Sequence, residues 1–76
     1  MKNLDVINAW KKGVSAKTKN LSTDGRELYS YALLIGYTDD LSRKVVKNYT
    51  KENYYSVTTS IHVNMAKKAS SITEEV

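Results

Sequence analysis

The 76-residue chain has no cysteine, no proline and no phenylalanine, and it contains a single histidine, His62. Without cysteine, no disulfide or thiolate metal site can staple the fold, and no thiol nucleophile exists. One histidine excludes every metal site that needs two imidazoles. A chain this short buries only about 60% of its unfolded surface, so its stability must come from packing or from association. We therefore expect no metal and no cofactor.

Long apolar segments are also absent. No apolar run approaches the ~20 residues of a membrane span, and the first ten residues lack the apolar core of a signal peptide. We therefore expect a cytoplasmic protein without membrane contact. Apolar residues make up 41% of the chain, a share typical of a folded domain rather than a disordered one. The length fits one domain over residues 1–76.

The charge balance is basic. The formal net charge is +4, which favours an acidic partner: a nucleic acid, an acidic protein surface or an anionic membrane. The same balance excludes a DNA mimic, whose surface would have to be strongly acidic. The competing interpretation is a surface whose lysines only keep the protein soluble.

Two helices are expected, one near each end of the chain. Asn3 is a favoured N-cap residue and Gly13 a favoured residue just past a helix end. The first helix should run between them, with Trp10 anchoring it to a sheet. The second helix should begin at one of the hydroxyl residues 58–60, and residues 70–76 should form a frayed tail. Apolar residues of the second helix recur at helical spacing: Ile61, Met65, Ala69 and Ile72.

The middle of the chain is predicted to be antiparallel sheet. Asp24 and Gly25 form a dipeptide typical of a two-residue type I′ hairpin, which would place Leu21 opposite Leu28. The second strand is expected over 26–38. Its middle is apolar on both faces, which indicates a central strand.

A third strand is expected over 42–49, after a turn at Asp39-Asp40, with Leu33 opposite Val46. An extended piece at 54–58 could add a fourth. This order of elements predicts a small α+β fold of two layers. Its sheet would be antiparallel with three to four strands, and it would carry an N-terminal and a C-terminal helix.

Alternation along these strands divides the predicted sheet into two faces. The face expected to pack against the helices carries Tyr29, Tyr31, Leu33, Ile35, Tyr37 and Val46. The other face combines an apolar centre with a basic rim, an arrangement typical of an interaction surface. The residues predicted to bind a partner are therefore Lys17, Lys19, Leu28, Leu34, Arg43, Val45, Lys47 and Tyr49.

An alternative binding site follows the third strand. Tyr54 and Tyr55 stand close to Lys51 in the sequence, and aromatic rings interleaved with lysines can stack bases and hold phosphates. His62 would lie near the start of the second helix, where backbone N–H groups favour an anion and keep the imidazole neutral. The competing interpretation is a thin core that uses tyrosine as an amphipathic filler.

No constellation of residues predicts catalysis. His62 follows the hydroxyls at 58–60, as a base follows a nucleophile in some hydrolases, but no residue is placed to orient the imidazole. The pair Asp39-Asp40 could ligate Mg²⁺ or Ca²⁺, yet no third ligand is evident, and aspartate is a preferred turn residue. We therefore expect a protein that binds and does not catalyse.

Two segments resemble motifs of a family of small phage and mobile-element proteins. They read SYALLIG at 30–36 and YSVTTSIH at 55–62. The family patterns are a SYxTLIA-like strand and a YSxTTSxH segment. In the first, Ala32 replaces the polar residue that usually follows the tyrosine, and Gly36 replaces a small alanine. The resemblance covers roughly residues 28–65, about half of the chain. It implies a phage origin without assigned enzymatic activity, and small phage proteins of this size are often stoichiometric inhibitors of host systems, including anti-CRISPR proteins.

Three functional hypotheses follow. The first is a phage-type inhibitor that acts in the cytoplasm of the host cell, by binding an acidic surface of a host defence protein or ribonucleoprotein. The second is a small basic accessory protein that binds nucleic acid. The third is an accessory protein that acts as a homo-oligomer. Salt separates the first two, because affinity for nucleic acid falls steeply with ionic strength and affinity for a protein falls less.

Overall fold

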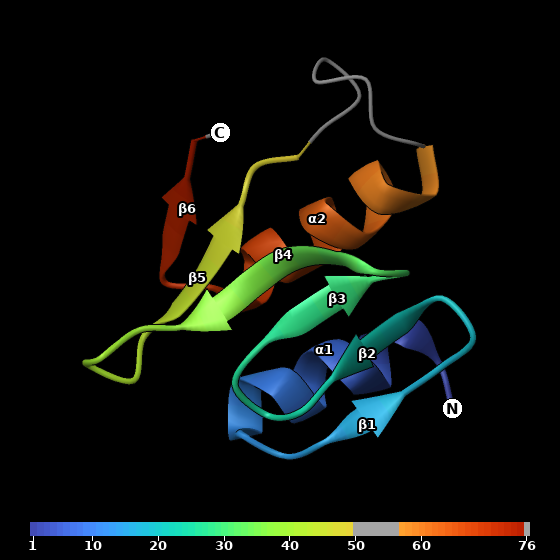
Figure 1. Cartoon of the computed structure of the whole chain (residues 1–76), viewed down its shortest axis with the longest axis horizontal. Coiled ribbons are helices and arrows are strands. Elements are labelled where there is room, and N and C mark those ends of the chain that lie inside the picture. Colours follow the sequence, from blue (N-terminus) through green and yellow to red (C-terminus); the bar gives the residue numbers. More distant parts are fainter. Residues whose placement is uncertain (50–56, 76) are drawn as a thin grey trace.

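The computed structural model describes residues 1–49 and 57–75 of the chain. In that part, two helices pack on one side of a six-stranded sheet, so the fold has two layers (Figure 1). The elements follow in the order α1 (Asn3–Lys12), β1 (Ala16–Lys17), β2 (Leu21–Thr23), β3 (Leu28–Ser30), β4 (Leu33–Thr38), β5 (Lys44–Lys47), α2 (Val57–Ala69) and β6 (Ile72–Glu74). Neither helix is long and apolar enough to cross a membrane, as far as the described residues go.

The strands lie side by side in their sequence order, β1 to β6. Each pairs with the next in antiparallel fashion until β5, whose pairing with β6 is parallel. Helix α2 makes the crossover that a parallel connection needs. The predicted α+β class with a helix near each end is confirmed, whereas the sheet is larger than expected and mixed. The extended piece predicted at 54–58 lies outside the described residues up to position 56, and α2 begins at Val57.

Helix α1 ends where the sequence predicted and begins one residue earlier than expected. Gly13 takes the left-handed conformation at the C-terminal end, and its N–H donates to the Trp10 carbonyl over 3.1 Å. At the other end Lys2, not Asn3, is the N-cap residue. The Asp5 carboxylate accepts the Lys2 backbone N–H over 2.9 Å, which is half of a capping box. The Asn3 side chain is therefore available for a different set of contacts.

The hairpin between β2 and β3 has a longer loop than predicted. Leu21 pairs with Ser30 instead of Leu28, so four residues, 24–27, make the connection. The cause is the Asp24 carboxylate, one oxygen of which accepts the backbone N–H groups of Arg26 and Glu27 over 2.9 and 2.8 Å. This Asx-type capture competes with the two-residue turn. Because the register moves by two residues, Leu21 and Leu28 still share one face of the sheet.

The single strand predicted over 26–38 is interrupted. The chain turns at Tyr31, whose φ is 55°, and Ala32, so that β3 and β4 pair with each other and Ser30 lies opposite Leu33. The Tyr31 N–H donates to the Asn20 carbonyl over 2.8 Å, which holds this turn against the chain that enters β2. A tyrosine in the left-handed region is uncommon, and no glycine or asparagine announces the turn in the sequence.

The predicted division into faces is inverted across β2 and β3. Leu21 and Leu28 are 1% and 0% exposed and pack under the helices, whereas Tyr31 is 56% exposed. Tyr29 and Tyr37 are half-buried on the opposite side of the sheet and donate their hydroxyls to glutamate side chains. Their rings therefore cover the outer face instead of filling the core.

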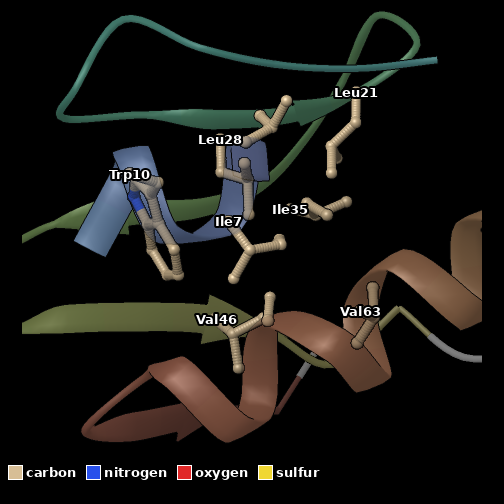
Figure 2. Packing of buried hydrophobic residues seen from close by; sticks show 9 residues of the cluster. Ile7, Trp10, Leu21, Leu28, Ile35, Val46 and Val63 are labelled. Atoms are coloured by element: carbon tan, nitrogen blue, oxygen red, sulfur yellow. The ribbon is translucent and has the colours of Figure 1, made fainter. Parts of the chain in front are cut away.

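The core forms around Trp10, which is fully buried (Figure 2). Its indole N–H donates to the Arg26 carbonyl over 3.0 Å. Its ring lies so close to Gly36 that a Cβ there would be 2.9 Å from it, so a side chain on this part of β4 would displace the indole. The predicted role of Trp10 as the anchor of the first helix is confirmed. The buried cluster consists of Val6, Ile7, Trp10, Leu21, Leu28, Ile35, Val46, Val63 and Ala66.

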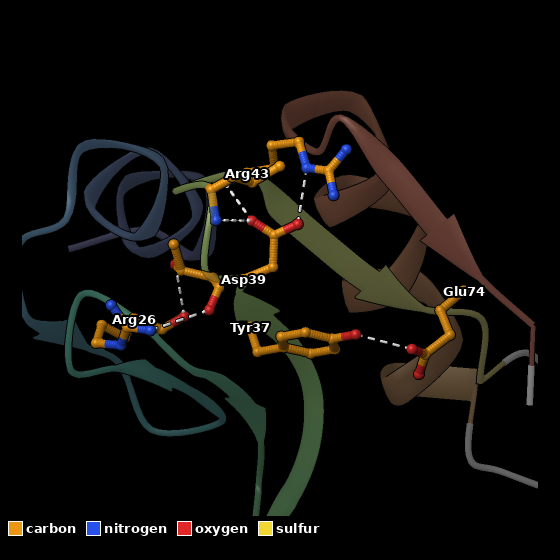
Figure 3. A network of polar contacts seen from close by, with 7 residues as sticks. Arg26, Tyr37, Asp39, Arg43 and Glu74 are labelled. Atoms are coloured by element: carbon orange, nitrogen blue, oxygen red, sulfur yellow. Dashed lines mark hydrogen bonds and ion pairs between the residues drawn. The ribbon is translucent and has the colours of Figure 1, made fainter.

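The third strand predicted over 42–49 is shorter and out of register. It runs over Lys44–Lys47, and Val46 pairs with Gly36 instead of Leu33, a shift of three residues. Ile35 and Val46 are nevertheless in the core, as predicted, whereas Tyr37 pairs with Val45 on the outer face. The loop before this strand is built around Asp39, whose carboxylate accepts the Arg43 N–H and Nε–H over 2.8 and 2.7 Å (Figure 3). The predicted turn at this place is confirmed, but it is longer than two residues.

The end of the chain does not fray over Ile72–Glu74. These residues form β6, the edge strand beside β5, in which Ile72 pairs with Val45. The Tyr37 hydroxyl donates to the Glu74 carboxylate over 2.8 Å and ties this edge to β4 (Figure 3). Ile72, which the periodicity placed on the second helix, therefore belongs to the sheet.

Alanine substitutions at two glycines with positive φ can test how the β2–β3 hairpin packs against the end of α1. Gly25 and Gly13 have φ of 99° and 82°, but a Cβ on Gly25 would lie 2.6 Å from the Gly13 carbonyl oxygen, whereas nothing stands within 4 Å of one on Gly13. Both Gly→Ala variants carry the left-handed strain of about 1 kcal/mol or more. We expect Gly25→Ala to cost roughly 1–3 kcal/mol beyond that, the usual range for overpacking. Urea denaturation of both variants measures the difference, and equal midpoints would contradict the packing of this hairpin on the end of α1.

Candidate partner-binding surface

The structure does not gather the eight predicted binding residues into one patch. Leu28 is 0% and Val45 4% exposed, so neither can contact a partner in this fold. Leu34 is half-buried opposite Tyr29, and Tyr49 packs against the core cluster. The apolar centre predicted for this surface is wrong, because the chain turns at Tyr31 and Ala32 instead of continuing as one strand, and the face that carries Leu28 is buried.

The predicted basic rim is also dispersed. Lys17 lies on β1 and Lys47 on β5, which are separated by three strands. Lys47 stands 4.0 Å from the Glu74 carboxylate, and Arg43 forms an ion pair with Asp39 at 2.7 Å. Lys17 and Lys19 are exposed near the opposite edge. Half of the rim is therefore matched by acids, and the other half belongs to a different part of the surface.

Three residues of the alternative site, Lys51, Tyr54 and Tyr55, lie outside the described residues. The fourth, His62, is 1% exposed and lies inside the fold. The predicted contact between its imidazole and an external anion or partner is therefore wrong for this conformation.

His62 instead forms the centre of a buried polar network that joins three elements. Its Nδ1 lies 2.7 Å from Ser30 Oγ on β3, and its Nε2 lies 3.2 Å from Asn3 Nδ2 on α1. Beyond these, Ser30 Oγ is 3.2 Å from Thr59 Oγ1, and Thr18 donates to Asn3 Oδ1 over 2.6 Å. A satisfied network of this kind fixes the relative position of the elements that contribute to it.

The hydrogen-bond directions in this network select one state of the imidazole. Thr18 Oγ1 accepts backbone N–H groups and spends its own proton on Asn3 Oδ1, so the Asn3 amide nitrogen must donate to His62 Nε2. The proton of the ring then sits on Nδ1 and is donated to Ser30. Protonation of Nε2 would place two donors face to face. Burial lowers the pKa of His62 below its ordinary value, which agrees with a neutral ring.

The pair Ser30–His62 has the residue types of a nucleophile and its base, with Asn3 beyond them. Ser30 and His62 are each 1% exposed, so no substrate reaches the hydroxyl in this conformation. The described residues also contain no group of three histidine or carboxylate side chains that could hold a metal ion. At Asp39 the carboxylate is occupied by backbone amides and Arg43. The hydrogen bonds of the network thus give Ser30 and His62 a structural role in the fold.

The outer side of the helices carries a groove that the sequence reasoning missed. Helices α1 and α2 lie side by side and run in the same direction (Figure 1). The groove between them has a volume of about 340 Å³. It is lined by Leu4, Ile7, Asn8, Lys11, Met65, Lys68 and Ala69, and we call it the helix groove. Leu4 is 54% exposed on it, and Ile61 is 52% exposed one turn before Met65 on α2.

The helix groove lies between the two helices, and these helices carry the excess of positive charge. Lys2 and the two helices together hold five of the twelve cations but one of the eight acids. The remaining seven cations and seven acids cancel. Because the helices are parallel, Lys11, Lys12, Lys67 and Lys68 all lie in the last turns at the same end. The net charge of the protein is therefore equal to that of Lys2 and the two helices, which together we call the helix layer.

A sequence signal for this groove did exist. Leu4, Asn8 and Lys11 are spaced by four and three residues, and Ile61, Met65 and Lys68 repeat the same spacing. Each trio defines one stripe of a helix. The apolar members were read as core residues, since an apolar residue at helical spacing is usually buried.

The buried imidazole predicts how stability depends on pH. The pKa of His62 is lowered in the fold, so the unfolded chain, with a histidine pKa of about 6.5, binds more protons. This contribution is fully present above about pH 6.5 and is lost as pH falls below it, at no more than about 1.4 kcal/mol per pH unit. We expect a lower free energy of unfolding at pH 5.5 than at pH 7.0, measured by urea denaturation. His62→Gln removes the only imidazole and should abolish most of this difference. Wild-type stability that is unchanged or higher at pH 5.5 would contradict the network.

No protein-family model, curated protein or solved structure matches the chain. The motif resemblance to small phage proteins therefore stays a prediction, and function has to be argued from the geometry and the charge of the described residues.

Proposed function

We propose that the protein is a non-enzymatic binding protein that occupies an acidic surface of a protein partner with its helix layer. The observation that carries this proposal is the placement of the whole net charge beside an exposed apolar groove. Exposed apolar side chains that lie together generally mark an interaction surface. Cations around such a surface speed the encounter with an acidic partner and disfavour basic ones.

The lysines alone would not support this proposal. The last turns of the two helices carry Lys11, Lys12, Lys67 and Lys68. A cation at this end stabilises its helix by about 0.3–1 kcal/mol through the helix dipole. They therefore have a use within the fold. The exposure of Leu4 and Ile61 has no such explanation, because these side chains gain nothing from contact with water. The combination favours a partner that is both acidic and apolar.

Action by occupancy follows from the state of the polar residues. The single histidine and the serine beside it are sealed inside the fold. With these two groups buried in the described part of the chain, we propose that the protein acts on its target by occupancy, in proportion to the amount present. This mode agrees with the predicted stoichiometric inhibitor of a host defence protein or ribonucleoprotein, a setting that rests on the motif resemblance.

The two other hypotheses are less favoured by the surface. Proteins that bind single-stranded nucleic acid stack bases on aromatic rings, and no aromatic residue is among those that line the helix groove. Two copies joined face to face through this groove would bring lysines of both copies together, and like charges repel. A partner of opposite charge fits the surface better than either nucleic acid or a second copy.

A pair of charge-reversed variants tests the proposed surface. Lys11→Glu combined with Lys68→Glu reverses two exposed cations of the helix layer, and Lys17→Glu combined with Lys19→Glu reverses two exposed cations near the β1 edge. The tagged proteins are used to capture partners from a bacterial lysate, with and without nuclease, after circular dichroism has verified the fold. We expect the helix variant to capture about tenfold less of the same protein, a loss of about 1.4 kcal/mol.

The control variant should capture nearly as much as wild type, because its charges lie outside the helix layer. An equal loss in both variants would indicate a general effect of net charge and contradict the surface. Loss of capture after nuclease treatment would indicate a nucleic-acid partner.

A further inference from the structure

We infer that the helix groove accepts an amphipathic helix of the partner protein, whose apolar side chains enter the groove and whose carboxylates face Lys11 and Lys68. This inference rests on the proposed function for the location of the surface and adds the form and chemistry of the occupant. Its observations are the shape of the groove, the repeat of its lining residues and the distribution of charge along it.

The shape follows from two parallel helices on one sheet. They contact each other and the sheet (Figure 1). Residues of both helices line the groove. Ile7, which is 1% exposed, lies at its base, and the small side chain of Ala69 leaves room on the α2 side. An amphipathic helix laid into a furrow of this kind contacts both walls, which is a recurrent mode of peptide recognition.

The spacing of residues matches on the two helices. On α1, the lining residues Leu4, Asn8 and Lys11 follow one another at four and three residues. On α2, the lining residues Met65 and Lys68 follow Ile61, which is exposed one turn before the groove lining, at the same spacing. The matching spacing places an apolar residue on each helix toward one end and a lysine on each toward the other. Met65 is half-buried between these ends and has a flexible side chain that adapts to different apolar surfaces.

The charge therefore changes along the groove. The apolar end has Asp5 and Lys2 nearby, which offset each other, whereas the far end has four lysines in the last helical turns. A helix prefers its own acidic residues in its first turn. An occupant whose acidic first turn lies at the lysine end would run antiparallel to α1 and α2 and would place its apolar residues along Leu4 and Met65.

A designed peptide is the probe for this occupant. It has about 16 residues, above the ~12–15 residues below which isolated helices are marginal, with leucines at i, i+3, i+4 and i+7, glutamates in its first turn, and alanine and glutamine at the other positions. A second peptide replaces every glutamate with lysine and keeps the leucines. A fluorophore on each peptide reports binding by anisotropy, and amide chemical shifts of the protein locate it. A labelled thymidine oligonucleotide is titrated in the same buffer.

We expect the glutamate peptide to bind saturably and to shift the amides of residues that line the helix groove. Lys11→Glu with Lys68→Glu should weaken this binding about tenfold or more, and Lys17→Glu with Lys19→Glu by less than about twofold. Leu4→Asn, at a side chain that is 54% exposed, should weaken binding without unfolding the protein. Binding should decrease with added salt, because exposed charges are screened.

Several results would overturn the inference. They are failure of the glutamate peptide to bind saturably, equal binding of the lysine peptide, equal loss in both charge-reversed variants, and amide shifts confined to the sheet. Tighter binding of the oligonucleotide than of the peptide would replace the helix by a nucleic acid.

The inference and the proposed function can fail separately. If capture of a partner depends on Lys11 and Lys68 but the glutamate peptide does not bind, the proposed surface is supported and the helical occupant is excluded. A peptide that binds in the groove, together with capture that ignores these lysines, would leave a helix-binding groove that the captured partner does not use.

Discussion

The burial of Trp10 is the contact on which the rest of the structure depends. The indole N–H holds the loop before β3 through the Arg26 carbonyl, the ring covers Gly36 on β4, and Lys44 Nζ on β5 lies 5.6 Å from the ring centroid. One side chain therefore connects α1 to three parts of the sheet. Since Val6, Ile7 and Trp10 face inward, helical geometry turns Leu4, Asn8 and Lys11 outward. The outer wall of the helix groove is thus a consequence of the inner anchor.

The His62 network fixes the second wall. Asn3 at the start of α1 and Ser30 on β3 both contact the imidazole, so α2 is held at the same end where α1 begins. Hydrogen bonds are directional, and this network sets the rotation of α2 more narrowly than apolar contact from Val63 and Ala66 would. Its cost is a buried polar cluster that must stay fully satisfied. The groove is therefore held by an apolar anchor on one helix and a polar one on the other.

Much of the helical half could be predicted from the sequence, and little of the sheet. Gly13 is a local signal, and Trp10 is large enough that its burial was expected. The start of the second helix was placed slightly late, because the hydroxyl residues 58–60 lie inside α2, which begins at Val57. The sheet errors share a cause. The Asp24 carboxylate lengthens one loop by capturing two amides, and Tyr31 takes a positive φ only because its N–H bonds to Asn20. Neither event leaves a pattern in the sequence. The turn at Tyr31 and Ala32 nevertheless brings Leu28 and Ile35 to the same buried face, whereas one continuous strand would place them on opposite faces. Strand β6 has three residues and exists only because β5 offers an edge.

The helix groove stayed hidden for a related reason. Periodicity shows that a helix has an apolar stripe, but it does not say how wide the buried part is. In α1 the sheet covers Val6, Ile7 and Trp10, and Leu4 lies at the border of this stripe and stays exposed. A chain of 76 residues can bury only a limited apolar area. The exposed side chains of Leu4 and Ile61 therefore contribute less hydrophobic stabilisation than they would if they were buried. Under the proposed function, a partner that covers them would restore that burial and stabilise the folded state by mass action, with the logarithm of its concentration relative to its dissociation constant. The proposed binding would therefore be coupled to fold stability through the outer stripe of the helices.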